Sequence, residues 1–350
     1  MNTVIILGAG ATRASGKRKP QGSKPPLDTD FFEIARVGSF AGYNEIVECI
    51  TSLVGDYSKT LLKSLETATT YLYIKAIDTK PGSKYHKGFL DLLQLLTNVL
   101  AATTNDLRVG PRSLIYRLIL SELKKLESPA NLTVITFNYD LLIERVLDEI
   151  SSTSYPNSFS FPECYGFKQN INTQAISDSP QFKNVNKTQN GIQILKLHGS
   201  MNWQSLHTSS SPKPATLFNP SREIHIGNSP MIYSSLTWKR QKRTVYLKPV
   251  IIPPISGKRR MMHSSMLSIW DKAGEALRLA NRVIIAGYSC PPLDLEARIL
   301  LSENLRVNQN KKIYVIDPSS ESASKFIDLC GVTHSTIYSS IKEWVNDSFV

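Results

Sequence analysis

Two short polar motifs in the chain carry residue types that can act chemically on a small molecule. The segment TFNYD places Asn138 and Asp140 two residues apart, and the segment KLHGS places His198 directly before a glycine. An asparagine amide can hydrogen-bond a hydroxyl, a carboxamide or a water without carrying charge, and a carboxylate can accept from a carboxamide NH₂. Histidine titrates near neutral pH, which suits a general base. Taken alone, Asn138 and Asp140 are equally ordinary helix-capping residues, and a lone histidine is more often structural.

A third motif, ILGAGAT, supplies Gly8 and Gly10. Glycines let backbone amides approach a pyrophosphate, and a helix that follows favours anions at its N-terminus. The motif departs from G-x-G-x-x-G because Arg13 stands at the sixth position, and no acidic strand end follows about 20 residues later. The spacing of a phosphate-binding loop of ATPases is absent too. The motif therefore predicts a nucleotide loop, with a plain tight turn as the alternative.

Two further motifs place polar groups where strands are expected to end. AGYS offers Gly287 and Ser289, whose amide or hydroxyl could hold phosphate, and IDP offers Asp317. A carboxylate at a strand end can bind both hydroxyls of a ribose. A capping role before proline explains Asp317 equally well.

The elements that must position these residues are short apolar strands separated by helices. We predict strands at Thr3–Leu7, Leu132–Phe137, Gly191–Gly199, Lys248–Pro254, Arg282–Ser289 and Lys311–Pro318. Helices are predicted to follow the second strand, to cover about Met266–Ala280, and to begin at the segment DLEARILLSENL, before a last helix and a short strand. Such βα units predict a mainly parallel sheet, in which ligands bind beyond the carboxyl ends of the strands.

The predicted fold class is therefore α/β, with a Rossmann-like, mainly parallel sheet flanked by helices and a helical insertion after the first strand. We expect one domain over residues 1–350. Its insertions are predicted at about 31–127, which is helical, and at 151–190 and 200–246, which are irregular. Within the first insertion, Phe89–Ala102 and Ser113–Leu126 have helical spacing, and Ser113 is a candidate N-cap.

Composition narrows the class of protein. The chain has 350 residues, 41% hydrophobic and 20% charged, as in ordinary globular proteins. No apolar stretch approaches the roughly 20 residues that span a bilayer, and TVIIL is too short for a signal peptide, so we expect a cytoplasmic protein without membrane association. Its four cysteines form no C-x-x-C pair, so neither a zinc ribbon nor a disulfide framework is predicted.

The formal net charge is +12, and much of the basic charge is clustered. The clusters are Lys17 to Lys19, Trp238 to Arg243 and Lys258 to Arg260. They can attract nucleic acid or another polyanion, although such clusters are also common on solvated loops. A pyrophosphate ligand would explain part of the bias. Nucleic-acid binding stays open, but no known reader motif accompanies the charge.

In their order along the chain, GAGAT, TFNYD, KLHGS, AGYS and IDP resemble the ordered motifs of the sirtuin superfamily. The specific part is LHGS with an upstream T-x-N-x-D, and the match covers five short blocks of the chain. The resemblance implies an NAD⁺ site to which these residues contribute: Gly8, Ala9, Gly10 and Thr12 along the dinucleotide, Asn138 by the nicotinamide ribose, Asp140 by the carboxamide, His198 as the catalytic base, Gly287 and Ser289 by phosphate, and Asp317 by the adenosine ribose.

The departures from the family pattern point to one branch of it. Protein deacetylases of the family insert a four-cysteine zinc ribbon after HGS, whereas residues 200–286 hold no cysteine. Their Phe-Gly-Glu substrate strand is missing too, and VIIPPISGKRR stands there instead. Phe137 and Tyr139, on either side of the asparagine, resemble the sirtuin-like NAD-hydrolase branch, which is associated with bacterial antiviral defence. The helical insertion also fits that branch.

We therefore expect hydrolysis of NAD⁺ to nicotinamide and ADP-ribose, used in antiphage defence by abortive infection and carried out without metal. An unrestrained NAD⁺ hydrolase would harm its own cell, so we expect control through a homo-oligomer or a regulatory partner such as an ATPase. Two alternatives stay open. The chain could be a non-catalytic sensor of NAD⁺ or ADP-ribose that controls a partner protein, or, less in keeping with the missing ribbon, a zinc-free protein deacylase.

Overall fold

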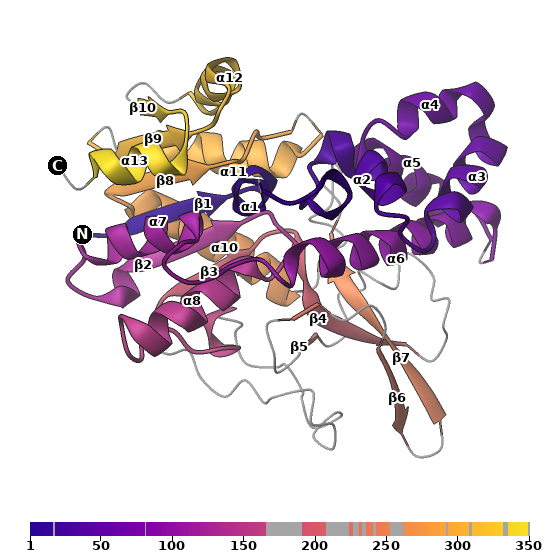
Figure 1. The fold of residues 1–350 in the computed structure, drawn as a ribbon, viewed down its shortest axis with the longest axis horizontal. Coiled ribbons are helices and arrows are strands. Elements are labelled where there is room, and N and C mark those ends of the chain that lie inside the picture. Colours follow the sequence, from indigo (N-terminus) through magenta and orange to yellow (C-terminus); the bar gives the residue numbers. More distant parts are fainter. Residues whose placement is uncertain are drawn as a thin grey trace.

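A central sheet of six strands, all parallel, organises the molecule (Figure 1). The structure is a computed structural model, and it describes the chain except at residues 17, 81, 166–190, 208–223, 227–230, 233–235, 241–242, 253–261, 263, 292, 308–309, 332–334 and 349–350. The six strands are β1 (Thr3–Leu7), β2 (Leu132–Thr136), β3 (Gln193–Lys196), β8 (Arg282–Ala286), β9 (Lys312–Ile316) and β10 (Ser335–Tyr338). The predicted Rossmann-like α/β class is confirmed.

The strand order reverses once, at the centre of the sheet, and we name this position the central crevice. The order is β3-β2-β1-β8-β9-β10, which is the 3-2-1-4-5-6 arrangement of doubly wound dinucleotide-binding folds. The chain moves outward from β1 through β2 to β3, and then returns to the other side of β1 with β8. Ligands of such sheets bind where the direction reverses, beyond the carboxyl ends of the strands. Here that point lies between the ends of β1 and β8.

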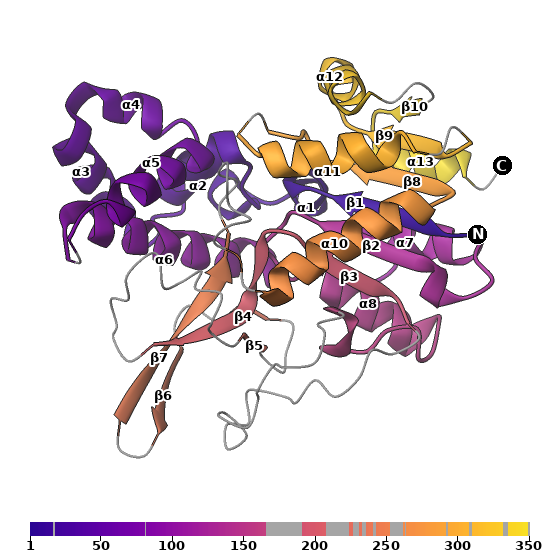
Figure 2. The same ribbon diagram turned by 180° about the vertical axis from the view of Figure 1, so that it is seen from behind.

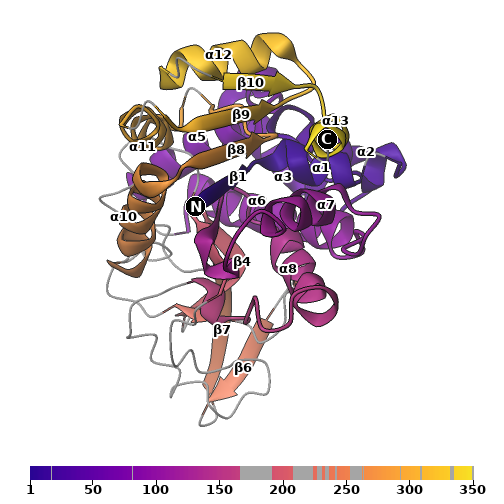
Figure 3. The ribbon, with the colours of Figure 1, turned by 90° about the vertical axis from the view of Figure 1, so that its left-hand side faces the viewer.

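Helices cover both faces of the sheet, as Figures 2 and 3 show. On one face lie α1 (Ala9–Ser15), α7 (Leu114–Leu123), α8 (Leu142–Thr153) and α13 (Ile341–Asp347). On the other lie α10 (Ser264–Leu279) and α11 (Leu295–Leu305), with α12 (Ser320–Cys330) packed against α11. Because both faces are covered, β1 consists of five buried residues, four of them aliphatic, as expected for a central parallel strand.

The predicted helical insertion after the first strand is confirmed. It contains α2 (Phe31–Val37), α3 (Tyr43–Val54), α4 (Ser58–Leu61), α5 (Leu65–Ile77) and α6 (Lys84–Thr104). These helices gather beyond the carboxyl ends of the strands (Figure 1). The predicted N-cap is also confirmed, since the hydroxyl of Ser113 accepts from the backbone N–H of Tyr116 at the start of α7. The chain also makes short 3-10 turns at Gln21–Ser23, Asp28–Asp30, Gly55–Tyr57, Pro129–Asn131 and Glu163–Tyr165.

A second sheet corrects two predictions. The segment Lys248–Pro254, predicted as a parallel strand of the main sheet, belongs in part to β7 (Arg243–Ile251), and β7 pairs antiparallel with its neighbours. The segment 200–246, predicted as irregular, contains β4 (Gly199–His207), β5 (His225–Ile226) and β6 (Leu236–Arg240), which complete a four-stranded sheet in the order β5-β4-β7-β6. An apolar run such as PVII has no feature that fixes the sheet or the direction in which it pairs.

The C-terminal elements differ slightly from the prediction, because α13 follows the short strand β10 and closes the described chain. None of the helices in the described part of the chain combines the length and the apolar character that crossing a bilayer requires. Residues 166–190, which make up most of one predicted irregular insertion, lie outside the described residues.

Candidate functional site

The loops after β1 and β8 meet at the central crevice through their glycines. The N–H of Gly10 donates to the carbonyl oxygen of Gly287 at 2.9 Å. A Cβ on Gly8 would lie 2.3 Å from that same oxygen, and a Cβ on Gly287 would lie 2.2 Å from the backbone nitrogen of Ala11. Gly287 also has φ +63°, which side chains rarely adopt. Three of the predicted nucleotide-site glycines are therefore required for two backbones to touch where the strand order reverses.

The side chain of Asn138 is held in one orientation by the loop after β1. Its Nδ2 donates to the carbonyl oxygen of Gly8 at 3.0 Å and to Oγ1 of Thr12 at 3.1 Å. A carbonyl oxygen can only accept, so the amide nitrogen must face Gly8. Both amide protons are thereby used, and Oδ1 is the atom left to accept a hydrogen bond from a hydroxyl or a water.

Asp140 uses its two carboxylate oxygens on two different elements, α8 and α1. Its Oδ1 accepts from the backbone N–H of Leu142 at 2.9 Å, at the start of α8. Its Oδ2 accepts from the hydroxyl of Thr12 at 2.9 Å. Because that hydroxyl also accepts from Asn138, the three side chains form one continuous chain of hydrogen bonds. Asp140 and Thr12 are buried, so the chain is fixed by its surroundings.

His198 follows β3 and faces a carboxylate that the sequence analysis did not select. Its Nε2 lies 2.7 Å from Oδ2 of Asp294, and the two side chains are 6% and 0% exposed. Asp294 is the N-cap of α11, with Oδ1 accepting from the N–H of Ala297. A buried carboxylate on a ring nitrogen fixes the tautomer of an imidazole and stabilises its protonated form, which is how a general base is oriented.

Aromatic rings from neighbouring strand ends enclose His198. Phe137 stacks on Tyr288 with ring centroids 3.9 Å apart and an angle of 6° between the planes. The rings of His198 and Phe137 meet in a T-shaped arrangement with their centroids 5.2 Å apart, and the centroid of the Tyr139 ring lies 6.2 Å from that of His198. Burial and the carboxylate of Asp294 raise the pKa of Tyr139, so its hydroxyl stays protonated and donates to the carbonyl oxygen of Ile252 at 3.1 Å. The rings give His198 a low-dielectric environment.

The remaining predicted residues lie around the crevice without direct contact to the Asn138 and His198 groups. Ala9 and Ser289 are exposed at the ends of β1 and β8. Asp317 follows β9, where the preceding residue Ile316 accepts from the N–H of Gly287 at 3.1 Å. The carboxylate of Asp317 accepts from the N–H of Ser319 at 2.8 Å, and Ser319 itself is the N-cap of α12.

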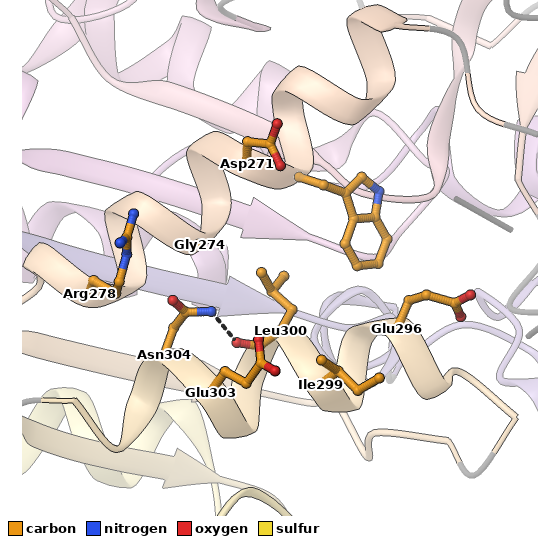
Figure 4. A pocket seen from close by; sticks show the side chains of 9 residues that line it. Asp271, Gly274, Arg278, Glu296, Ile299, Leu300, Glu303 and Asn304 are labelled. Carbon is orange, nitrogen blue, oxygen red and sulfur yellow. Dashed lines mark hydrogen bonds between the residues drawn. The ribbon is translucent and has the colours of Figure 1, made fainter. Parts of the chain in front are cut away.

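A cavity of about 420 Å³ lies between α10 and α11, and none of the predicted site residues lines it (Figure 4). Its walls include Trp270, Asp271, Arg278, Glu296 and Leu300. The indole N–H of Trp270 donates to the carbonyl oxygen of Leu197, the residue before His198, at 2.9 Å. The wall of the cavity therefore contacts the strand end that carries the histidine.

The described part of the chain offers neither a group of metal ligands nor most of the basic clusters. Among the residues that the structure describes, no three histidine, cysteine, aspartate or glutamate side chains are grouped to hold a metal ion. The basic side chains of the clusters at 238–243 and 258–260, together with residue 17, lie outside the described part of the chain.

No protein-family model and no curated protein matches the chain. Among solved structures, it is similar to one described as the structural basis of sirtuin substrate affinity, with 13% identity and a TM-score of 0.38 over 100% of this chain and 92% of the other. A Sir2–peptide–NAD⁺ complex has 13% identity and a TM-score of 0.37 over 99% and 91%. A Sir2 homologue in complex with ADP-ribose has 11% identity and a TM-score of 0.41 over 99% and 90%.

Proposed function

We propose that the chain binds NAD⁺ at the carboxyl ends of β1, β2, β3, β8 and β9 and hydrolyses it to nicotinamide and ADP-ribose. The observation that carries the proposal is that two side chains, which follow the neighbouring strands β2 and β3, are each held in one orientation by protein partners. Asn138 has both amide protons engaged, and His198 is paired with the buried Asp294. Binding alone does not require either arrangement, whereas chemistry at a ribose requires both an acceptor and a base.

The reaction needs one positioned water, a base and a site that excludes bulk solvent. The bond between nicotinamide and C1′ of the ribose breaks with both electrons going to the ring nitrogen, which leaves neutral and needs no general acid. The ribose becomes oxocarbenium-like, and water adds to C1′. His198 accepts the proton from that water or from a ribose hydroxyl, and Asp294 stabilises the resulting imidazolium. Oδ1 of Asn138 accepts a hydrogen bond from the same water or hydroxyl.

Each of the other predicted residues has a place in this proposal. Gly8, Ala9, Gly10 and Thr12 line the dinucleotide, Asp140 lies by the carboxamide, Gly287 and Ser289 lie by phosphate, and Asp317 binds the adenosine ribose. The close contact between Gly10 and Gly287 supports this arrangement, because it leaves no side chain between the two loops. The half-buried Asp317 carboxylate can exchange its backbone partner for ribose hydroxyls.

The cellular role follows from the motif resemblance. We propose that the chain acts in the cytoplasm in antiphage defence, where NAD⁺ depletion halts the infected cell. A toxic activity of this kind requires control, which we assign to a homo-oligomer or to a separate regulatory protein such as an ATPase. Light scattering at micromolar concentration, combined with an activity assay, tests the oligomer: a fully active monomer contradicts it.

The main alternative is a sensor that binds NAD⁺ or ADP-ribose without cleaving it. Calorimetric titration of the purified chain with NAD⁺, followed by measurement of free nicotinamide in the same sample, separates the two. The proposal predicts binding and nicotinamide release, at the latest when proteins encoded nearby are added. Binding without release under all these conditions favours the sensor. Release that depends on an acylated peptide favours a zinc-free deacylase.

A further inference from the structure

A fully buried ion pair lies beneath the candidate site, and the proposed reaction does not use it. Nζ of Lys196, the last residue of β3, is 2.9 Å from Oε1 of Glu144 in the first turn of α8, and both side chains are 0% exposed. Removing two charges from water costs several kcal/mol per ion, and well-packed apolar residues often serve stability as well. The position of this pair therefore calls for an explanation other than stability alone.

Lys196 connects the pair to the loop that carries Asn138. Its Nζ also donates to the carbonyl oxygen of Asp140 at 2.5 Å. Asp140 also accepts from the other side: Thr12 donates to its carboxylate, and Asn138 donates to the Thr12 hydroxyl. A series of contacts thus links the buried lysine to the amide whose orientation the proposed reaction needs, with the hydrogen bonds on the two sides joined through the covalent bonds of Asp140.

The far end of the pair is equally fixed. Oε1 of Glu144 also accepts from the hydroxyl of Tyr165 at 2.9 Å. Burial and the neighbouring Glu144 carboxylate raise the pKa of Tyr165, so the phenol keeps the proton that it donates. Nδ2 of Asn202 in turn donates to the hydroxyl oxygen of Tyr165 at 3.1 Å, and Ser200 donates to Asn202 at 2.6 Å. The carboxylate of Glu144 is therefore held by the lysine on one side and, through Tyr165, by the start of β4 on the other.

We propose that Lys196 and Glu144 are positioning residues, which hold the Asn138 amide in its reactive orientation through Asp140 and Thr12. The predicted effect on kcat rests on the proposed NAD⁺ hydrolysis. The predicted effect on the orientation of the Asn138 amide does not, because it can be measured without turnover.

The first experiment measures hydrogen exchange of the Asn138 side-chain amide by NMR, with the signal assigned by its loss in Asn138→Ala. Both protons have protein acceptors, so exchange should be slow in the wild type. We expect Lys196→Met and Glu144→Gln each to accelerate it at least about tenfold. The matched control is Glu122→Gln. The buried carboxylate of Glu122 pairs with Arg282 at 2.8 Å, near the amino ends of the strands. Breaking this pair should leave the exchange rate of the Asn138 amide unchanged. Unchanged exchange in folded Lys196→Met or Glu144→Gln overturns the proposal.

The second experiment is a double-mutant cycle on nicotinamide release, with rates normalised to folded protein. Lys196→Met and Thr12→Val each interrupt the series, so each should lower kcat by about 10- to 100-fold with a smaller effect on KM. Because both act through the same amide, the double variant should be no slower than the slower single variant. Glu144→Gln replaces Lys196→Met if the latter does not fold. Additive losses contradict the series of contacts. A wild type without turnover would end the hydrolase proposal, while the exchange experiment would still decide the positioning role.

Discussion

Nε2 of His198 and Oδ2 of Asp294 lie 2.7 Å apart, although 96 positions separate the two residues in the chain. Asp294 cannot move freely, because its other oxygen caps α11 and the hydroxyl of Tyr288 approaches the same Oδ2 at 3.4 Å. The histidine is therefore oriented by a helix from the opposite half of the sheet. This arrangement joins the two halves of the doubly wound fold at the residue proposed as the base.

Replacing Asp294 by asparagine tests this orientation. Asparagine caps a helix about as well as aspartate, so α11 should persist. The neutral amide cannot stabilise an imidazolium, and it allows the wrong tautomer. We expect kcat for nicotinamide release to fall between about tenfold and 10⁴-fold, with the melting temperature nearly unchanged.

The matched control for Asp294 is Glu296→Gln, which removes a carboxylate from the same first turn of α11. Glu296 lines the cavity between α10 and α11 and has no role in the proposed reaction. Turnover should stay within about twofold of the wild type, as for a substitution that leaves the barrier unchanged. Equal losses in the two variants would mean that the charge of the helix start matters and the contact with His198 does not.

The contact between the loops after β1 and β8 should tolerate no side chain. Gly287→Ala combines a left-handed backbone with a Cβ 2.2 Å from the nitrogen of Ala11. Gly42→Ala has the backbone cost alone, since φ is +93° and nothing lies within 4 Å of its Cβ. We expect Gly287→Ala to lower the free energy of unfolding by about 1–3 kcal/mol more than Gly42→Ala does. Denaturant titration measures the difference, and equal effects would contradict the close contact.

The sequence predicts much of this site because of one property of parallel sheets. Residues that follow different strands meet at the same edge, so short motifs alone predict that Asn138 and His198 belong to one site. Asp294 could not be assigned in this way, because it begins a helix eight residues after β8 ends and has the composition of an ordinary cap. The orientation of Asn138 also depends on a tertiary contact, the carbonyl of Gly8, which no local pattern encodes.

Asp317 should affect binding of NAD⁺ more than turnover. Under the proposed function its carboxylate contacts the adenosine ribose equally in the ground state and the transition state. Asp317→Ala should therefore raise KM about tenfold or more and leave kcat nearly unchanged. Ser319→Ala is the control, since it removes the N-cap of α12 next to this loop and should cost about 1 kcal/mol of stability without changing KM. A large loss of kcat in Asp317→Ala would place this residue in the reaction itself.

The chain should contain no stoichiometric metal after purification. None of the predicted roles uses a metal ion, and the cysteine spacing lacks the pairs of a zinc ribbon. Elemental analysis should find well below one zinc per chain, and turnover should survive treatment with a chelator. One zinc per chain, or activity lost to the chelator and restored by zinc, would contradict the proposed mechanism.

The most direct measurement is nicotinamide release by wild type, Asn138→Ala, His198→Ala and the control His86→Ala at saturating NAD⁺, with a thermal melt of each. His86 is a buried histidine in the helical insertion, away from the crevice, so its loss should reduce stability and spare turnover. Loss of a positioned base costs about 10²–10⁴ in rate, and we predict this loss for His198→Ala and a comparable one for Asn138→Ala in folded protein. Wild-type turnover in the folded His198 variant would contradict the account.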